Sequence, residues 1–481
     1  MPVHQLPGNP SLERLRKQAK SLRRDARAGM PHALGLVAEF HPRPPASLTL
    51  SDAQLVTARM YGFTSWPRLK QHLDTIRRYS RSPHQVGAGG ELADEFLRLA
   101  CLTYGTDVPG RTRQADLMLG THPRLAAANV FTMAATGSYD ALGDLLTEEP
   151  DLAVRQGGPF AWEPLLYLSY ARLRAPGRWV ESARLLLECG ADPDSGYLWE
   201  GLTSPFTALT GAFGGGEHDE PAHPQALELA RLLLRSGADP NDSQTLYNRG
   251  LGDEVFTDDT THLELLLEHG LGGGDGGPWR ARLGPALQSP RQLLRDELST
   301  AALRGGPNRA RLLLAHGVEA DSIGAHPVYG GHTPYRLALR HGHAEVAEVL
   351  ASAGASTTPD TTDAFAAACM RADADAVAAL GPEPLARALT TTPELINYAA
   401  EHRNAAAVRL LAELGFDVNH LLHCTPLHEA VWNDDVETAR TLIELGADPR
   451  IKDTEHDSSV LGWARFGGKR QVEAILRGLT P

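Results

Sequence analysis

The chain has 481 residues and a formal net charge of −13, and aromatic residues make up only 6% of it. It contains no run of 18 apolar residues, which excludes a helix that spans a membrane, and its first residues lack the apolar core of a secretion signal. The four cysteines are scattered and form no Cys-x-x-Cys pair. The sequence therefore predicts neither a zinc framework nor a disulfide framework, and it favours a cytoplasmic protein.

Residues 1–85 differ in charge from the rest of the chain. They contain 14 Lys and Arg against 5 Asp and Glu, whereas the remaining residues contain 32 against 54. The stretch "NPSLERLRKQAKSLRRDARAG" predicts a helix with one apolar stripe and a largely basic remainder. A second helix is expected from Ser51, capped with the help of Gln54, to Gly62, and a third in "FTSWPRLKQHLDTIRRY". We expect 1–85 to be a basic helical module, and 79–90 to read as a linker.

The basic helix near the N-terminus has three interpretations. A basic stripe can bind the phosphate groups of nucleic acid in a salt-dependent way. It can also dock against the acidic remainder of the chain, or it can be a solvated helix face. No recognised nucleic-acid motif accompanies the stripe, so nucleic-acid binding is the less favoured alternative.

A linker and helical lead-in is expected over 86–124, followed by a recurring pattern. Apolar helix ends such as "RLLLEC", "RLLLRS" and "RLLLAH" are each followed by a glycine that opens a turn. The steps between successive turn glycines are 47, 33, 47, 37, 61 and 31 residues. The glycines are Gly190, Gly237, Gly270, Gly317, Gly354, Gly415 and Gly446.

The extended turns after Gly190 and Gly237, and the segment "GAHPVYGGH" before Thr333, carry aromatic side chains. After Gly190 the turn is extended as "DPDSGYLWEGLTSPF", and after Gly237 as "DPNDSQTLYNRGLG". Aromatic residues on polar loops are candidate anchors for a partner, and the alternative is that they pack inward and hold the loops down. Nearby acidic residues would favour a basic partner. The candidate contact residues are Tyr197, Trp199, Phe206, Tyr247, Asn248, Tyr329, Asp194 and Asp242.

No pattern of catalytic or metal-binding residues is strong. The segment "NHLLHCTPLH" places His420, His423, Cys424 and His428 together, but their spacing matches no zinc framework. The glycine-rich segments do not end in Gly-Lys-Ser/Thr, and no Gly-x-Ser-x-Gly or His-Glu-x-x-His motif is present. We therefore expect no catalytic residues, no metal and no cofactor, and an enzyme with an unrecognised site is the least favoured interpretation.

The clearest repeated unit is "CTPLHEAVWNDDVETARTLIELGADP" at 424–449. Thr425 can cap a helix that begins with Pro426, and Asp434 or Asp435 can cap a second one. Leu427 lies on the apolar face of the first helix, and Gly446 supplies a left-handed stop for the second. The unit reads as helix, tight turn, helix and projecting turn. A similar unit, "HTPYRLALRHGHAEVAEVLASAGA", opens with Thr333 and Pro334.

These units resemble the ankyrin repeat, in which Thr-Pro-Leu-His opens the unit and a glycine turn closes it. The repeat is close to 33 residues, so the longer steps are a repeat plus an insertion or two repeats together. The resemblance covers about Leu125 to Leu479 and implies an all-α solenoid of about ten helix-turn-helix units over 125–481. It also implies that His428 ties the opening turn by hydrogen bonds. His341 and His343 are interpreted as structural histidines between helices.

The resemblance implies a non-catalytic scaffold that binds a protein or peptide through the concave face and the projecting turns of the stack. Residues 1–85 are similar to a small helical module that precedes ankyrin repeats in many bacterial proteins. The last unit looks polar enough to cap the stack, so a monomer is favoured over a polymer. The identity of the partner does not follow from the fold.

Overall fold

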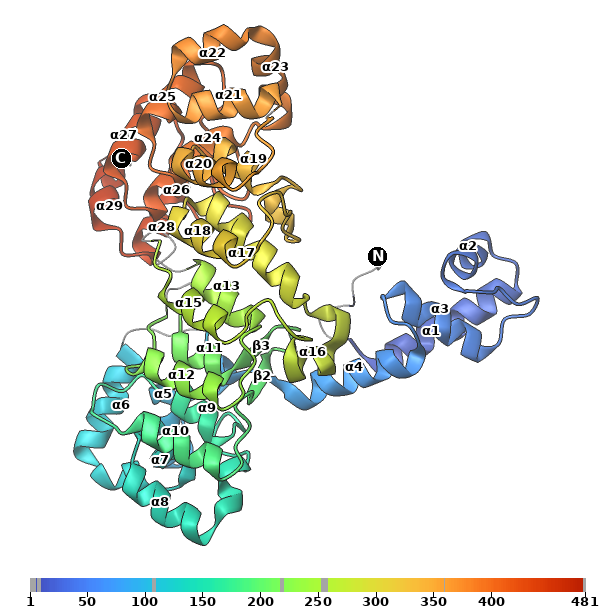
Figure 1. The fold of residues 1–481 in the computed structure, drawn as a ribbon, viewed down its shortest axis with the longest axis vertical. Coiled ribbons are helices and arrows are strands. Elements are labelled where there is room, and N and C mark those ends of the chain that lie inside the picture. Colours follow the sequence, from blue (N-terminus) through green and yellow to red (C-terminus); the bar gives the residue numbers. More distant parts are fainter. Residues whose placement is uncertain are drawn as a thin grey trace. The chain divides into compact units, whose positions relative to one another are not determined.

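The computed structural model describes Leu6 and residues 10–105, 110–216, 220–251, 258–358 and 360–478. These residues are mostly helical (Figure 1). The chain divides into two compact units, of which the first comprises Met1–Asp253 with Thr261–Leu293. The second comprises Glu254–Thr260 with Leu294–Pro481.

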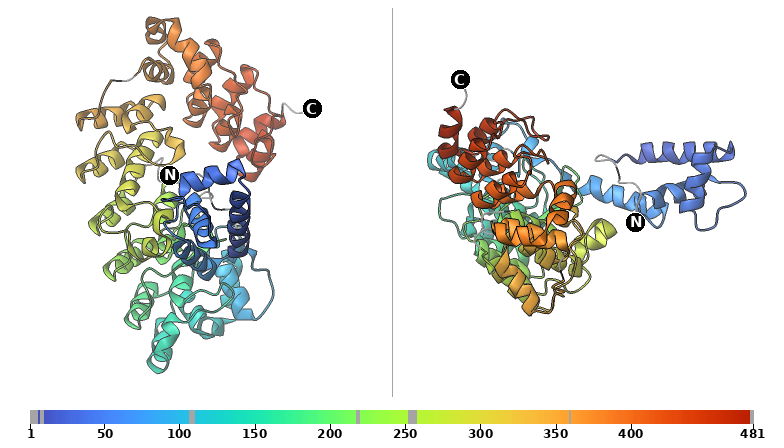
Figure 2. Two further views of the ribbon diagram at one scale, coloured as in Figure 1. Left: turned by 90° about the vertical axis from the view of Figure 1, so that its right-hand side faces the viewer. Right: turned by 90° about the horizontal axis from the view of Figure 1, so that it is seen from above.

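The N-terminal helices of the first unit bury the predicted apolar stripe. Leu15, Ala19 and Leu22 on the first helix are buried, while most of its basic side chains are exposed. Figure 2 shows these helices in blue, packed on one another. One of them, α2, was not expected from the sequence. The helices are α1 (Leu12–Arg27), α2 (Pro31–Phe40), α3 (Leu50–Met60) and α4 (Trp66–Tyr79).

The start of α3 differs from the expectation. Thr49 is the capping residue, not Ser51, and Asp52 completes the capping box in place of Gln54. The Asp52 amide donates to the Thr49 hydroxyl oxygen at 3.2 Å, and the Thr49 amide donates to the Asp52 carboxylate at 2.8 Å. A carboxylate near the first turn also interacts favourably with the helix dipole, which explains why this register is preferred.

The remainder of the first unit consists mainly of stacked helix pairs. The first helices of successive pairs pack on one another, and so do several of the second helices. Two helices and a 3-10 turn precede the stack: α5 (Leu92–Ala100), α6 (Gly110–Thr121) and η2 (Pro123–Ala127). The pairs are α7 (Val130–Thr136) with α8 (Tyr139–Glu148), α9 (Pro164–Tyr170) with α10 (Trp179–Glu188), α11 (Ala208–Phe213) with α12 (Ala226–Arg235), and α13 (Ser243–Leu251) with α15 (Thr261–Glu268). The other elements are η1 (Pro83–Gln85), η3 (Pro150–Val154), α16 (Gly277–Leu283) and η4 (Gly284–Ala286).

A small sheet corrects the expectation of an all-α fold. Strand β1 (Ser80–Arg81) pairs in parallel with β2 (Gly196–Trp199), which pairs antiparallel with β3 (Pro205–Thr207). Part of the expected 79–90 linker is thus a strand, and the insertion after Gly190 is a hairpin. The insertion after Gly237 also differs, because residues 243–251 form α13 rather than a projecting turn.

The second unit is a further series of helix pairs, which follow α17 (Pro290–Arg304), a helix that crosses the division between the units. Its buried core contains mainly Leu, Ala and Val side chains from successive pairs. The remaining helices are α18 (Pro307–Ala315), α19 (Pro334–Arg340), α20 (Ala344–Ser352), α21 (Thr361–Met370), α22 (Ala374–Leu380), α23 (Pro382–Thr391), α24 (Leu395–Glu401), α25 (Ala405–Glu413), α26 (Pro426–Trp432), α27 (Val436–Glu444), α28 (Val460–Phe466) and α29 (Arg470–Arg477), with the 3-10 turn η5 (Pro327–Tyr329) before α19.

Capping contacts fix the pair α26–α27. Thr425 precedes α26, and its amide nitrogen and hydroxyl lie 3.3 and 2.8 Å from Nδ1 of His428. Nε2 of His428 lies 3.3 Å from the carbonyl oxygen of Ser458. The carboxylate of Asp435 accepts from two amides in the first turn of α27, and Gly446 ends the unit with a φ of 94°. The buried imidazole therefore connects two successive turns.

Candidate functional site

Two of the aromatic candidates from the insertions lie in the interior of the first unit. Tyr197 and Phe206 are buried, and their rings stack with centroids 5.6 Å apart. Tyr197 also stacks on Trp162 at 4.9 Å. The Tyr170 hydroxyl donates to the carbonyl oxygen of Thr207 at 3.0 Å, which ties this aromatic cluster to β3. These rings correspond to the packing alternative and are not available to a partner in this structure.

The other aromatic candidates differ from one another in how far they are exposed to solvent. Trp199 is half-buried, donates from Nε1 to the Thr103 carbonyl at 2.9 Å and stacks on His84. Tyr329 is buried, and its hydroxyl lies 2.9 Å from that of Thr300. Tyr247 on α13 is 48% exposed and is the one member of this group with a large exposed ring.

The polar candidates of the first unit are buried as well. Burial raises the pKa of Asp194 to about 7, although its carboxylate accepts the Asp239 amide at 2.9 Å. Burial likewise raises the pKa of Asp242 to about 6, against hydrogen bonds from Thr207 and Thr245. Asn248 is buried and accepts from Gln244 at 2.8 Å. These side chains therefore belong to the hydrogen-bonded interior and do not form an acidic surface for a basic partner.

A surface with exposed aromatic side chains occurs instead in the second unit, where it involves α26 and α28. Trp432 is the last residue of α26 and is 37% exposed, and Phe466 is the last residue of α28 and is 76% exposed. Half-buried Trp463 packs edge-to-face on Trp432 at 5.6 Å. Lys469 Nζ lies 5.2 Å from the Trp432 ring centroid, a cation–π distance. We refer to Trp432, Trp463, Phe466 and Lys469 as the α26–α28 patch.

The turn after α27 is fixed by a carboxylate that also holds the patch. Asp453 accepts from the indole Nε1 of Trp463 at 2.9 Å and from the amides of Glu455, His456 and Ser458. Burial of this carboxylate is outweighed by these donors, which lower the pKa of Asp453 to about 2. The orientation of Trp463 is therefore set before any partner binds.

The turn before α26 exposes apolar and polar side chains. Leu421 and Leu422 are exposed, and His423 Nε2 lies 3.6 Å from a carboxylate oxygen of Glu429. The buried Cys424 thiol donates to the same oxygen at 3.0 Å. Burial and the Glu429 charge raise the pKa of Cys424, so this thiol is protonated and is a poor nucleophile and metal ligand.

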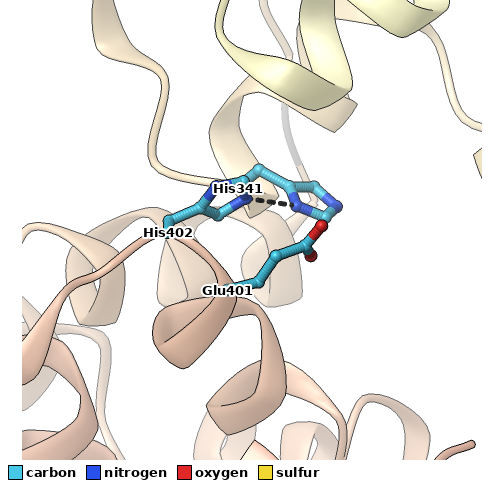
Figure 3. A group of neighbouring side chains, drawn as sticks. All are labelled: His341, Glu401 and His402. Atoms are coloured by element: carbon cyan, nitrogen blue, oxygen red, sulfur yellow. Dashed lines mark hydrogen bonds between the residues drawn. The ribbon is translucent and has the colours of Figure 1, made fainter. Parts of the chain in front are cut away.

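His341, Glu401 and His402 form a second cluster at the ends of α19 and α24 (Figure 3), and His343 at the start of α20 lies beside it. Nδ1 of His341 lies 3.0 Å from Nε2 of His402, and each residue directly follows the last residue of its helix. The rings of His343 and His402 meet edge-to-face at 4.7 Å. The Glu401 carboxylate lies beside His341 and is paired with Arg304 of α17. Sequence analysis assigned His341 and His343 a structural role but did not identify Glu401 or His402, which are 60 and 61 positions away.

The described residues contain two groups whose side chains could hold a metal ion. One is His341, Glu401 and His402, and the other is His423, Cys424 and Glu429. In each group the ligand atoms lie within 4.8 Å of one another. Burial raises the pKa of the thiols of Cys101 and Cys369 to about 12, which disfavours a nucleophilic thiolate at either position.

Comparison with protein families identifies part of the second unit. Residues 365–453 match the family model for ankyrin repeats (3 copies). The chain is an ankyrin repeat-containing protein. No curated protein matches its sequence. Ankyrin repeats are in general protein–protein interaction modules and are typically non-catalytic. Among the residues that the structure describes, no helix combines the length and apolar character needed to cross a membrane.

The matched ankyrin segment contains Trp432 but ends before Trp463 and Phe466. The sequence did contain a signal for these side chains. Trp432 and Phe466 occupy the same position in successive helix pairs, directly before the turn that joins the two helices of each pair. The aromatic residues predicted as contacts lie in insertions, whereas these two lie at a repeated position of the helix pairs.

Proposed function

We propose that this ankyrin repeat-containing protein is a non-catalytic scaffold that binds a partner protein or peptide. The contacts are made by the α26–α28 patch together with the turn before α26. The observation that carries the proposal is the exposure of two large rings, Trp432 and Phe466, at equivalent positions of successive helix pairs. In an ankyrin stack the first helices and projecting turns of successive repeats form one continuous binding surface.

The chemistry of the patch suits a binding anchor. Tryptophan and other aromatic side chains are enriched among the interface residues that contribute most to affinity. Trp463 is held by Asp453 and supports Trp432 from one side, so little side-chain entropy is lost when a partner covers them. The chain beyond residue 85 is acidic overall, which favours a partner whose surrounding surface is basic.

The experiment compares capture of partners from the native host by the full-length protein and its variants. We expect Trp432→Ala and Phe466→Ala each to weaken binding of a captured protein by about 30-fold, the effect of removing a strong interface anchor. Leu117→Ala is the matched control, because Leu117 is a large exposed apolar side chain in α6 of the other unit. Unchanged capture by both aromatic variants, with folding intact by circular dichroism, would contradict the proposal.

Tyr247 and Trp199 provide the corresponding test of the earlier candidates. Loss of binding in Tyr247→Ala or Trp199→Ala, but not in Trp432→Ala, would place the binding surface in the first unit.

We further propose the domain organisation expected from the sequence, with a basic module at 1–85, a lead-in at 86–124 and a solenoid of about ten repeats from 125. The cytoplasmic location is proposed from the four free cysteines.

A second candidate function is favoured by one observation on α1. Its basic side chains are mostly exposed, and exposed basic stripes bind nucleic-acid phosphates. The exposed members are Arg14, Arg16, Lys17, Lys20, Arg24 and Arg27. The capture experiment is therefore repeated after nuclease treatment. Partners that disappear with nuclease, together with binding that falls steeply with salt and is lost without 1–85, would favour this alternative.

A further inference from the structure

The cluster in Figure 3 brings together side chains from helices that are distant in sequence. His341 follows α19, whereas Glu401 ends α24 and His402 follows it. One possible ligand atom from each of the three lies within 4.8 Å of the other two. Two imidazoles and one carboxylate are a donor set that divalent transition metals bind in proteins.

The distance between the two imidazoles is close to that of a metal site. Nδ1 of His341 and Nε2 of His402 are 3.0 Å apart. Two nitrogens bound to one tetrahedral zinc ion at about 2.05 Å are about 3.3 Å apart. An ion can therefore replace the shared hydrogen bond with a small rearrangement of the rings, while the Glu401 side chain moves closer to complete the set.

Neighbouring groups orient the three side chains. His343 packs against His402, and its Nε2 lies 3.0 Å from the Leu303 carbonyl. Tyr398 packs on the His341 ring with centroids 4.3 Å apart. Asn433 donates to the Glu401 carbonyl at 2.7 Å. Partners of this kind fix the orientation of metal ligands in proteins.

We propose that His341, Glu401 and His402 form a binding site for a divalent transition metal such as zinc. Three protein ligands leave one coordination position for water or another ligand. The group His423, Cys424 and Glu429 is the less favourable of the two, because its thiol is protonated and donates to the carboxylate. The Arg304–Glu401 pair competes with the ion, so removal of Arg304 strengthens metal binding.

The test uses untagged full-length protein, because a polyhistidine tag binds the same ions. After treatment with a chelator, the protein is titrated with Co²⁺ and then with Zn²⁺. We expect one equivalent of Co²⁺ to bind with visible absorption bands of nitrogen and oxygen ligation, without the intense near-ultraviolet band of a thiolate ligand. Zn²⁺ then displaces Co²⁺ and removes the visible bands.

His402→Asn is the principal variant, since Asn433 occupies the equivalent position after α26 and the fold tolerates it there. We expect His402→Asn and Glu401→Gln each to weaken Co²⁺ binding by at least 100-fold, and Arg304→Gln to strengthen it. His316→Asn, which changes an exposed histidine after α18, serves as the matched control and should bind normally.

Absence of Co²⁺ binding by the unmodified protein at micromolar concentrations would overturn the proposal. Unchanged binding by both His402→Asn and Glu401→Gln would overturn it as well. A thiolate band that disappears in Cys424→Ser would assign the metal to the second group instead. If His402→Asn fails to fold, as judged by circular dichroism, Glu401→Gln decides the outcome because it preserves the shape of the side chain.

Discussion

At the scale of single residues, buried histidines join parts of the chain that are separated in sequence. His428 connects the turn before α26 to the turn before α28, and His343 connects α20 to the end of α17. The imidazole of His428 suits this role because one nitrogen can donate while the other accepts, and the two reach the amide of Thr425 and the carbonyl of Ser458. Burial lowers the pKa of His428, so the ring stays neutral at physiological pH.

We expect His428→Ala to lower the free energy of unfolding of the second unit by about 2–4 kcal/mol, because buried backbone groups lose their partners. Thermal unfolding followed by circular dichroism measures this loss. His456→Ala is the control, since the His456 side chain is exposed on the neighbouring turn. Equal unfolding temperatures for the two variants would show that the contacts of His428 with Thr425 and Ser458 contribute nothing measurable.

At the scale of secondary-structure elements, the β2–β3 hairpin depends on one glycine. A Cβ atom added to Gly196 would lie 2.9 Å from the Phe206 carbonyl oxygen and 3.0 Å from the Trp279 ring. These contacts are too short, and the backbone oxygen cannot move away freely. We expect Gly196→Ala to destabilise the first unit by about 1–3 kcal/mol, as overpacking does in other interiors.

Urea unfolding monitored by tryptophan fluorescence tests this expectation, because Trp162, Trp199 and Trp279 all lie close to the hairpin. Gly87→Ala is the matched control: an added Cβ there meets nothing within 4 Å, and its backbone needs no positive φ. Coincident unfolding curves for the two variants would mean that the hairpin accommodates the added methyl group with no loss of stability.

The elements also show which parts of the structure could be predicted from the sequence. The helices α26 and α27 follow from local signals, namely capping residues, helical spacing of apolar residues and a turn glycine. The hairpin does not, because β2 has only four residues and its buried partner Trp279 is 80 positions from Trp199. The burial of Tyr197 and the meeting of His341 with His402 are likewise consequences of contacts distant in sequence.

At the scale of the whole molecule, the chain has two compact units, each with its own helix pairs and interior. In repeat proteins each repeat contacts mainly the repeats next to it, so the effect of a core mutation is concentrated around its site. Leu442 on α27 is fully buried within the core of the second unit. Replacement of a buried leucine by alanine costs about 2–5 kcal/mol, because it removes packing and leaves a cavity.

We therefore expect differential scanning calorimetry of the full-length protein to resolve two transitions, of which Leu442→Ala lowers only one. For a unit of this size the shift should be about 5–15 °C. Leu421→Ala, which truncates an exposed leucine of the same unit, should leave both transitions within about 2 °C, since surface substitutions change stability little. If a single transition is observed instead and Leu442→Ala lowers it, the two units unfold as one cooperative body, and the expectation of independent units is wrong.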